Sequence, residues 1–372
     1  MENNYLKDQI ITYMGNKRKL LTNIETEIDK IKKKLNKDLT IGDGFSGSGI
    51  VSRLLKTKCN ELYSNDLAGY SHTLNTCYLS NPTESTINTL RTYIDKANKL
   101  AENEDNCKEQ WVSKHWSPKN KNNIASDDRV YFTYENGKRI DIIRDYIETI
   151  PKKYRPYLLA PLLVESSIHN NTNGQFSAFY KNADGIGKYG GKNSVDVKRI
   201  TQPIQLKYPI FHNNECKTIV TKQDANEWAK SFKDKPLDII YYDPPYNKHP
   251  YNIYYFMLDI INDWDKTIEI PKTNRGQPQG WRTSAYNSVK NAKNSMKNLL
   301  ENTHAKYVIL SYNDGGIIPI AELDNLIKEV SKDMEKIPIV HKTYNRLKGI
   351  SNYKRENEYK PVKEFLYVIK LT

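Results

Sequence analysis

Short apolar runs that end in a polar residue recur along the chain and predict the strands of a parallel sheet. The clearest run covers residues 237–242 (LDIIYY) and is apolar on both faces, as in a buried parallel strand. It ends at Asp243, because Pro244 cannot donate to a strand ladder. Similar runs predict strands at residues 39–43, 61–66, 218–221, 305–313 and 364–369.

Apolar residues spaced three or four apart predict helices between these strands. The clearest is at residues 20–35, with Gly15 and Asn16 as a tight entry. Other helices are expected near residues 143–150, 158–168 and 321–330. Alternating strands and helices predict an α/β fold with a doubly wound sheet. The alternation breaks at residues 81–205, which predict a helical and loop insertion between a first part (1–80) and a second part (206–372).

Composition narrows the class of partner. The chain of 372 residues has 57 Lys and Arg against 44 Asp and Glu, a formal net charge of +13. Such an excess favours a polyanion such as nucleic acid, although the lysines could also form a solvated face. The four cysteines form no Cys-x-x-Cys pair, so we expect neither a zinc site nor a disulfide framework. No apolar run is long enough to span a bilayer, so we expect a cytoplasmic protein with no membrane partner.

The residues that follow the strand at 237–242 suit chemistry on an amino group. Ligands bind beyond the carboxyl ends of strands in open α/β sheets. The prolines hold the carboxylate of Asp243 and the carbonyl of Pro244 in a stiff arrangement, and two acceptors match the exocyclic amine of adenine or cytosine. Tyr246 offers a ring on which an extruded base can stack. The alternative is an ordinary surface turn.

The tetrapeptide Asp243-Pro244-Pro245-Tyr246 resembles the signature of S-adenosylmethionine-dependent amino-methyltransferases, in the form typical of adenine-specific DNA enzymes. Residues 13–17 (YMGNK) resemble the Tyr/Trp-x-Gly-x-Lys element that opens the alpha group of these DNA enzymes. Residues 43–49 (DGFSGSG) resemble their glycine turn, and the Glu-x-Leu at residues 364–366 is also similar to theirs. The likeness covers almost the whole chain and is weakest in the insertion.

The resemblance implies S-adenosylmethionine as the cofactor and a Rossmann-like methyltransferase sheet. Glycines in the turn allow the backbone to approach the ligand, and Asp66 after the second strand is the expected partner of the ribose hydroxyls. Asp224 is the candidate partner of the cofactor's adenine. The expected cofactor-binding residues are Tyr13, Gly15, Asn16, Lys17, Asp43, Phe45, Ser46, Gly47, Ser48, Gly49, Asp66, Asp224 and Ala225. No metal is expected.

The resemblance also implies methyl transfer to adenine N6 in double-stranded DNA, by direct attack of a flipped base. Residues 1–80 would then bind the cofactor, 81–205 would recognise the target, and 206–372 would carry the methyl-transfer motif. The expected catalytic residues are Asp243, Pro244, Pro245 and Tyr246. Expected DNA-binding residues are Lys248, His249, Tyr251, Asn252, Lys188 and Lys192. A cognate restriction endonuclease could exist in the same system, with no obligate complex implied.

Two alternatives stay open at this point. Transfer to cytosine N4, or to adenine in RNA, would use the same acceptor geometry, although the Ser-Pro-Pro-Tyr motif that favours cytosine is absent. A non-catalytic DNA-binding protein on the same fold is the other alternative. The intact Asp43, Asp66 and Asp243 argue against it.

Overall fold

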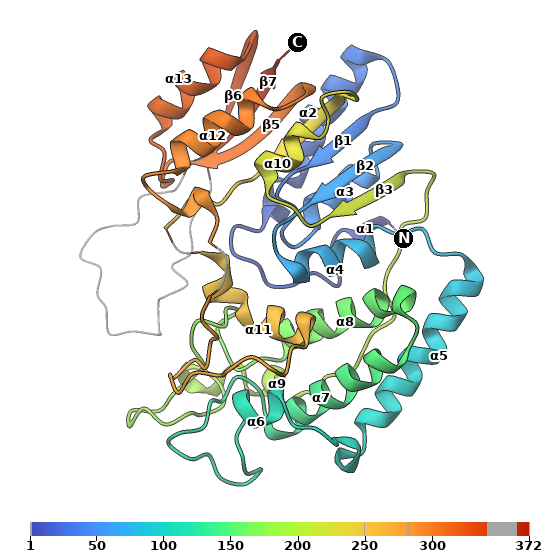
Figure 1. Cartoon of the computed structure of the whole chain (residues 1–372), viewed down its shortest axis with the longest axis vertical. Helices are drawn as coiled ribbons and strands as arrows, with labels where there is room; N and C mark the ends of the chain where they lie inside the picture. The colour runs from blue at the N-terminus through green and yellow to red at the C-terminus, as the bar shows by residue number, and fades with distance from the viewer. Residues whose placement is uncertain (1, 249, 281–282, 341–362, 372) are drawn as a thin grey trace. The chain divides into compact units, whose positions relative to one another are not determined.

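The computed structural model describes residues 2–248, 250–280, 283–340 and 363–371 (Figure 1). The chain forms two compact units. The helical unit consists of Met1–Gly15, Thr76–Asn213 and Tyr251–Arg282, and the sheet unit of Asn16–Asn75, Asn214–Pro250 and Thr283–Thr372.

Within its described residues, the sheet unit contains a seven-stranded sheet of order β3-β2-β1-β4-β5-β7-β6. The strands are β1 (Thr40–Asp43), β2 (Glu61–Asn65), β3 (Lys217–Thr221), β4 (Leu237–Tyr242), β5 (Ala305–Asn313), β6 (Asp333–Val340) and β7 (Lys363–Lys370). Strands β1 to β5 pair in parallel, whereas β7 lies antiparallel between β5 and β6. The predicted doubly wound α/β sheet is confirmed.

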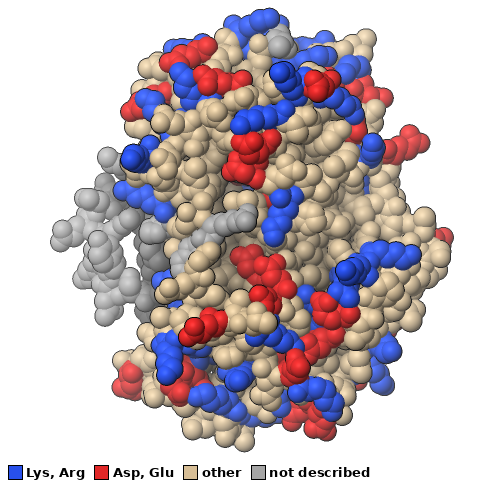
Figure 2. Space-filling model, viewed as in Figure 1, with Lys and Arg blue, Asp and Glu red and all other residues tan. Residues whose placement is uncertain are grey.

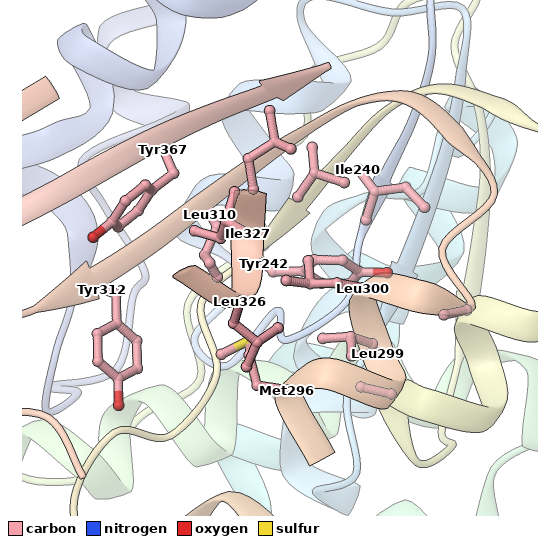
Figure 3. Packing of buried hydrophobic residues seen from close by; sticks show 14 of the residues in the cluster. Ile240, Tyr242, Met296, Leu299, Leu300, Leu310, Tyr312, Leu326, Ile327 and Tyr367 are labelled. Carbon is pink, nitrogen blue, oxygen red and sulfur yellow. The ribbon is translucent and has the colours of Figure 1, made fainter. Parts of the chain in front are cut away.

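Strand β4 is the middle strand of this sheet, and both of its faces are covered. All six of its residues are buried. Ile240 and Tyr242 pack with residues of the helices α10 (Ala225–Lys230), α12 (Ala292–Glu301) and α13 (Ile320–Val330), as Figure 3 shows for the last two. The other helical segments of this unit are η1 (Lys17–Leu20), α2 (Leu21–Leu35), α3 (Ile50–Lys56) and η5 (Ala285–Asn287). Burial on both faces explains why the sequence of β4 is continuously apolar.

The helical unit is built around α5 (Glu84–Ala101), α7 (Tyr134–Thr149), α8 (Arg155–Ile168) and α11 (Tyr251–Asp263). Its shorter helices are α1 (Glu2–Tyr5), α6 (Val112–Trp116) and α9 (Val197–Thr201), with the 3-10 turns η2 (Glu104–Asn106), η3 (Lys152–Tyr154) and η4 (Lys192–Ser194). Helix α4 (Gly69–Tyr78) runs from the sheet unit into this one.

Buried polar side chains connect the segments of the helical unit. Asp141 of α7 accepts from the backbone N–H of Val112 at 2.8 Å and so caps α6. Arg144 donates to the carbonyl of Ile261 at 2.7 Å, and Arg129 to that of Pro271 at 2.7 Å. Residues 251–280 therefore pack with the insertion in one unit, although the sequence analysis grouped them with the methyl-transfer motif. The division of roles among 1–80, 81–205 and 206–372 stays a prediction.

Two features were not expected from the sequence. The edge strand β6 was missed, because polar residues interrupt its first half and Pro338, which only an edge strand tolerates, interrupts its second half. Cys59 and Cys216 lie with their Sγ atoms 3.7 Å apart despite a separation of 157 residues. Among the residues that the structure describes, no helix is long and apolar enough to cross a membrane.

Candidate active site

Three acidic side chains follow neighbouring parallel strands of the sheet unit. Asp43 ends β1, Asp66 follows β2, and Asp243 follows β4. Asp43 pairs in register with Ser64 of β2 and with Tyr241 of β4. The carboxyl ends of these strands therefore meet at one edge, where open α/β sheets bind their ligands.

The glycine turn after β1 follows a path that larger residues would obstruct. A Cβ atom on Gly44 would lie 2.5 Å from the ring of Tyr242. Gly47 and Gly49 have φ of 50° and 80°, a left-handed conformation that favours glycine. The backbone N–H of Gly47 donates to Asp66 Oδ2 at 2.7 Å, which ties the turn to the end of β2.

Asp43 is fully buried and only partly satisfied. Ser52 Oγ donates to its Oδ2 at 2.6 Å, whereas Asp43 Oδ1 has no hydrogen-bond partner among the described residues. The pKa of Asp43 is raised to about 7: burial is the main cause, the hydrogen bond from Ser52 opposes the rise, and the charges of Asp66 and Asp243 add to it. Asp43 Oδ1 can therefore accept a hydrogen bond from a ligand, or pair with a positively charged group of a ligand.

Asp66 is held by the backbone. Its two oxygens accept from Gly47 N–H at 2.7 Å and from Ala68 N–H at 2.9 Å. Burial raises the pKa of Asp66, and these hydrogen bonds oppose the rise. The carboxylate is thus fixed in orientation at the end of β2.

Asp243 forms an ion pair with a lysine from the N-terminal part of the sheet unit. Lys17 Nζ lies 3.1 Å from Asp243 Oδ1 and also pairs with Glu364 Oε1 of β7. Burial raises the pKa of Asp243 to about 6; Lys17 opposes the rise and Glu364 adds to it. Burial alone would lower the pKa of Lys17, but Asp243, Tyr246 and Glu364 together raise it, so the lysine is charged.

Tyr246 is fixed beside this ion pair. Its ring lies edge-on to that of Tyr312, with centroids 6.1 Å apart, and Lys17 Nζ lies 5.4 Å from its centroid. The carbonyl of Tyr246 accepts from Ile317 N–H at 2.8 Å. The ring that the sequence analysis expected to stack on a base is therefore held within the same side-chain cluster as Asp243.

Asp224, Ala225, Phe45 and Lys248, which the sequence analysis also expected at the site, belong to the sheet unit. Asp224 caps α10 by accepting from the backbone N–H of Asn226 at 2.9 Å, and it is exposed, whereas Ala225 is buried. Phe45 packs edge-on against Tyr286, with centroids 5.3 Å apart. Lys248 is exposed.

Other expected site residues belong to the helical unit. Tyr13 stacks on Tyr251 and Tyr255, with centroids 5.1 and 4.8 Å apart, and the Tyr255 hydroxyl accepts from Met14 N–H at 2.6 Å. Gly15 is the last residue of this segment. The backbone carbonyl of Asn252 accepts a hydrogen bond from Gln277 Nε2 at 3.1 Å.

Two expected DNA-binding lysines lie elsewhere in the helical unit. Lys188 is in a hairpin where its N–H donates to the Tyr180 carbonyl at 3.0 Å, and Lys192 begins η4. His249 lies outside the described residues. The roles assigned to all of these residues stay predictions.

Glu364 was not among the expected site residues. The only signal for it in the sequence was the resemblance of its Glu-x-Leu element to the family, which gave no role. Its partnership with Lys17 joins residues 347 apart in the sequence, and spacing cannot predict such a contact.

The fold and this site together define a class. The last strand, β7, runs antiparallel between β5 and β6, a glycine turn follows β1, an acid follows β2, and Asp-Pro-Pro-Tyr follows β4. Together these features define the fold of the S-adenosylmethionine-dependent methyltransferases. A family model described as D12 class N6 adenine-specific DNA methyltransferase matches residues 13–346. The chain belongs to this family, and it is an enzyme that methylates adenine in DNA.

Curated relatives agree with this family. The chain is 28% identical over 370 residues to the Type II methyltransferase M.NlaIII of Neisseria lactamica, covering 97% of this chain and 100% of the relative. It is 28% identical to the Type II methyltransferase M.CviAII of Paramecium bursaria Chlorella virus 1, covering 87% of this chain and 89% of the relative. It is 27% identical to the modification methylase StsI of Streptococcus sanguinis, of which it spans 48%.

Proposed function

We propose that this enzyme transfers the methyl group of S-adenosylmethionine to adenine N6 at a specific site in double-stranded DNA, as the modification enzyme of a restriction-modification system. The names of the relatives, which include Type II methyltransferases and a modification methylase, support the restriction-modification role. The carboxyl cluster at the ends of β1, β2 and β4 carries the proposal for the methyl donor.

The charge of this cluster fits a cationic cofactor. Burial, and to a smaller extent the carboxyls of Asp66 and Asp243, raise the pKa of Asp43, and Asp43 Oδ1 is buried without a hydrogen-bond partner among the described residues. A ligand with a positive group would relieve both conditions. S-adenosylmethionine has a sulfonium and an ammonium group, whereas a dinucleotide would bring phosphates to an acidic site.

The sheet unit offers groups for each part of this cofactor. Asp66 would accept from the ribose hydroxyls, and Asp43 with the glycine turn would hold the methionine end. Asp224 and Ala225, at the start of α10, would border the adenine. S-adenosylmethionine supplies an electrophilic methyl group on its sulfonium sulfur.

The Asp-Pro-Pro-Tyr segment prepares the nucleophile. The carboxylate of Asp243 and the carbonyl of Pro244 accept hydrogen bonds from the two N–H groups of the adenine amine. These hydrogen bonds localise the lone pair of the nitrogen. The charge of Asp243 stabilises the positive charge that develops on the nitrogen as it attacks the methyl carbon in line. As the bond between the nitrogen and the methyl carbon forms, the bond between that carbon and the sulfonium sulfur would break, and S-adenosylhomocysteine would leave. The amine proton passes to solvent with or after transfer, and no covalent enzyme intermediate forms. Pro245 keeps the segment stiff, and Tyr246 stacks on the flipped base.

One experiment tests the reaction and its site together. The purified enzyme would be incubated with S-adenosylmethionine and random-sequence DNA, and modified bases would be located by sequencing. We expect N6-methyladenine in one sequence context and none in an RNA of the same sequence. N4-methylcytosine, or adenines modified without sequence preference, would contradict the proposal. Calorimetry with S-adenosylmethionine and with NAD as a control would test the choice of cofactor.

A further inference from the structure

Glu364 reaches the active site from β7, far along the chain from the other motifs. Its carboxylate pairs with Lys17 Nζ, which lies 3.1 Å from Asp243 Oδ1. Ser311 Oγ of β5 donates to Glu364 Oε1 at 3.0 Å and fixes this carboxylate. The side chains of Lys17, Asp243 and Glu364 are 4%, 18% and 16% exposed. Two carboxylates therefore share one ammonium where little water can screen them.

The second carboxylate changes the net charge beside the reacting amine. A lysine paired with Asp243 alone would neutralise it and weaken its attraction for a developing positive charge. With Glu364 present, the three side chains carry a net negative charge when both acids are ionised. Buried charge is costly unless it is paired, and the shared lysine meets this requirement without cancelling the charge.

We propose that Glu364 is a positioning residue for methyl transfer: it shares the ammonium of Lys17, and so it orients the carboxylate of Asp243 and leaves it the negative charge that stabilises the attacking amine. Glu364 acts through Lys17 and need not touch the substrate. This inference rests on the role proposed above for Asp243.

The charged groups around Asp243 should determine how the rate of methyl transfer depends on pH. Lys17 faces Asp243 from η1, Glu364 from β7, and Asp43 from β1; Tyr241 and Tyr246 face it from its own segment. Burial raises the pKa of Asp243 to about 6, Lys17 lowers it and Glu364 raises it. Loss of the charge of Glu364 should therefore lower this pKa, and loss of the charge of Lys17 should raise it. Because transfer requires ionised Asp243, the acid limb of the rate profile should follow.

The test measures single-turnover methyl transfer from pH 5 to 8 with saturating S-adenosylmethionine and DNA. Glu364→Gln should reduce the plateau rate on the order of tenfold, less than loss of a group that contacts the transition state. Its acid limb should move to lower pH by about one unit, as expected for loss of a nearby like charge. Lys17→Met should move the limb to higher pH. Glu329→Gln is the matched control, because Glu329 is exposed on α13 and pairs with Lys297, and it should change neither quantity.

Each outcome decides the inference. Glu364→Asp keeps the charge and should keep the acid limb at the wild-type pH. A lower plateau for Glu364→Gln with an unmoved limb would mean that Glu364 only supports the fold, and would overturn the inference. If Glu364→Gln fails to fold, as judged by loss of S-adenosylmethionine binding, the Lys17→Met and Glu364→Asp profiles decide it in the same way.

Asp243→Ala separates this inference from the proposed function. If Asp243→Ala transfers methyl at the wild-type rate, the proposed role of Asp243 fails. If it is inactive while the Glu364→Gln limb stays in place, only the inference on Glu364 fails.

Discussion

The acidic residues of the active site differ in environment although they look alike in the sequence. Asp43 is fully buried, and one of its oxygens has no hydrogen-bond partner among the described residues. Asp66 is held by two backbone N–H groups, and Asp243 is paired with Lys17. The sequence analysis placed each after its strand, because a strand end can be read from where the apolar run stops. It could not predict their pKa shifts, since these depend on burial and on partners distant in the sequence.

Substitution of Asp243 is the most direct test of the proposed mechanism. Asp243→Ala should bind S-adenosylmethionine and DNA within about tenfold of wild type and lose on the order of a hundredfold or more in single-turnover rate. The fold should survive, because Lys17 keeps Glu364 as a partner. Asp243→Asn should retain more activity, since its amide oxygen still accepts, though without charge. A near-normal rate for Asp243→Ala would indicate that the segment is only a turn.

Asp43 should make cofactor binding depend on pH. Its pKa is raised to about 7, so the carboxyl is largely protonated at pH 6 and largely ionised at pH 8. Because a cationic ligand prefers the ionised form, S-adenosylmethionine should bind more tightly at pH 8 than at pH 6. Calorimetry in buffers of different ionisation heat should detect proton release near pH 7. Equal affinity at both pH values, or the same pH dependence in Asp43→Asn, would be evidence against this role.

At the scale of elements, the strands and turns that carry the site were predictable because their signals are local. Apolar runs gave β1, β2, β3, β4, β5 and β7 to within a residue or two, and the glycine turn was recognisable from residues 43–49. The sequence analysis did not predict strand β6, because an edge strand needs no continuous apolar run. The turn's shape also depends on a contact that the sequence does not display, between Gly44 and the ring of Tyr242.

Gly44→Ala should therefore destabilise the sheet unit. The added Cβ would lie 2.5 Å from Tyr242, whose ring is fully buried and whose hydroxyl bonds to Thr303 Oγ1 at 2.9 Å, so neither can move freely. We expect a loss of about 1–3 kcal/mol in the free energy of unfolding, as for an overpacked core. Denaturant unfolding would measure it. Gly315→Ala is the control, because its Cβ would meet only Asn313 Oδ1 at 3.5 Å, and an equal loss there would refute the steric argument.

At the scale of the whole molecule, composition predicted a polyanionic partner but not where it binds. Figure 2 shows Lys and Arg interspersed with Asp and Glu on the face in view, so the net charge of +13 is not gathered into one patch there. The grouping of residues 251–280 with the insertion was not predictable either. It depends on contacts such as Arg144 to Ile261, which join residues 117 apart.

DNA affinity should nevertheless fall steeply with salt. Each phosphate neutralised by a lysine or arginine contributes a slope of about −0.9 to a plot of log affinity against log salt. Lys248→Ala should reduce the slope by about one if this exposed residue contacts phosphate. Lys297→Ala should leave it unchanged, since Lys297 is on α12 in an ion pair with Glu329. A flat plot for the wild type would mean that the lysines form only a solvated face.

The order of strands in the sheet has a consequence for how the enzyme is made. Strand β1 pairs with β4, and Thr40 contacts Asp238 across 198 residues, a span that includes all of Thr76–Asn213. At 5–20 residues per second, a ribosome needs about 10 to 40 s to cross this span. During that time the β4-facing edge of β1 has no partner, and an open apolar edge is a template for misassembly. The nascent chain should therefore depend on chaperones, and refolding of the pure protein should be slow and favoured by dilution.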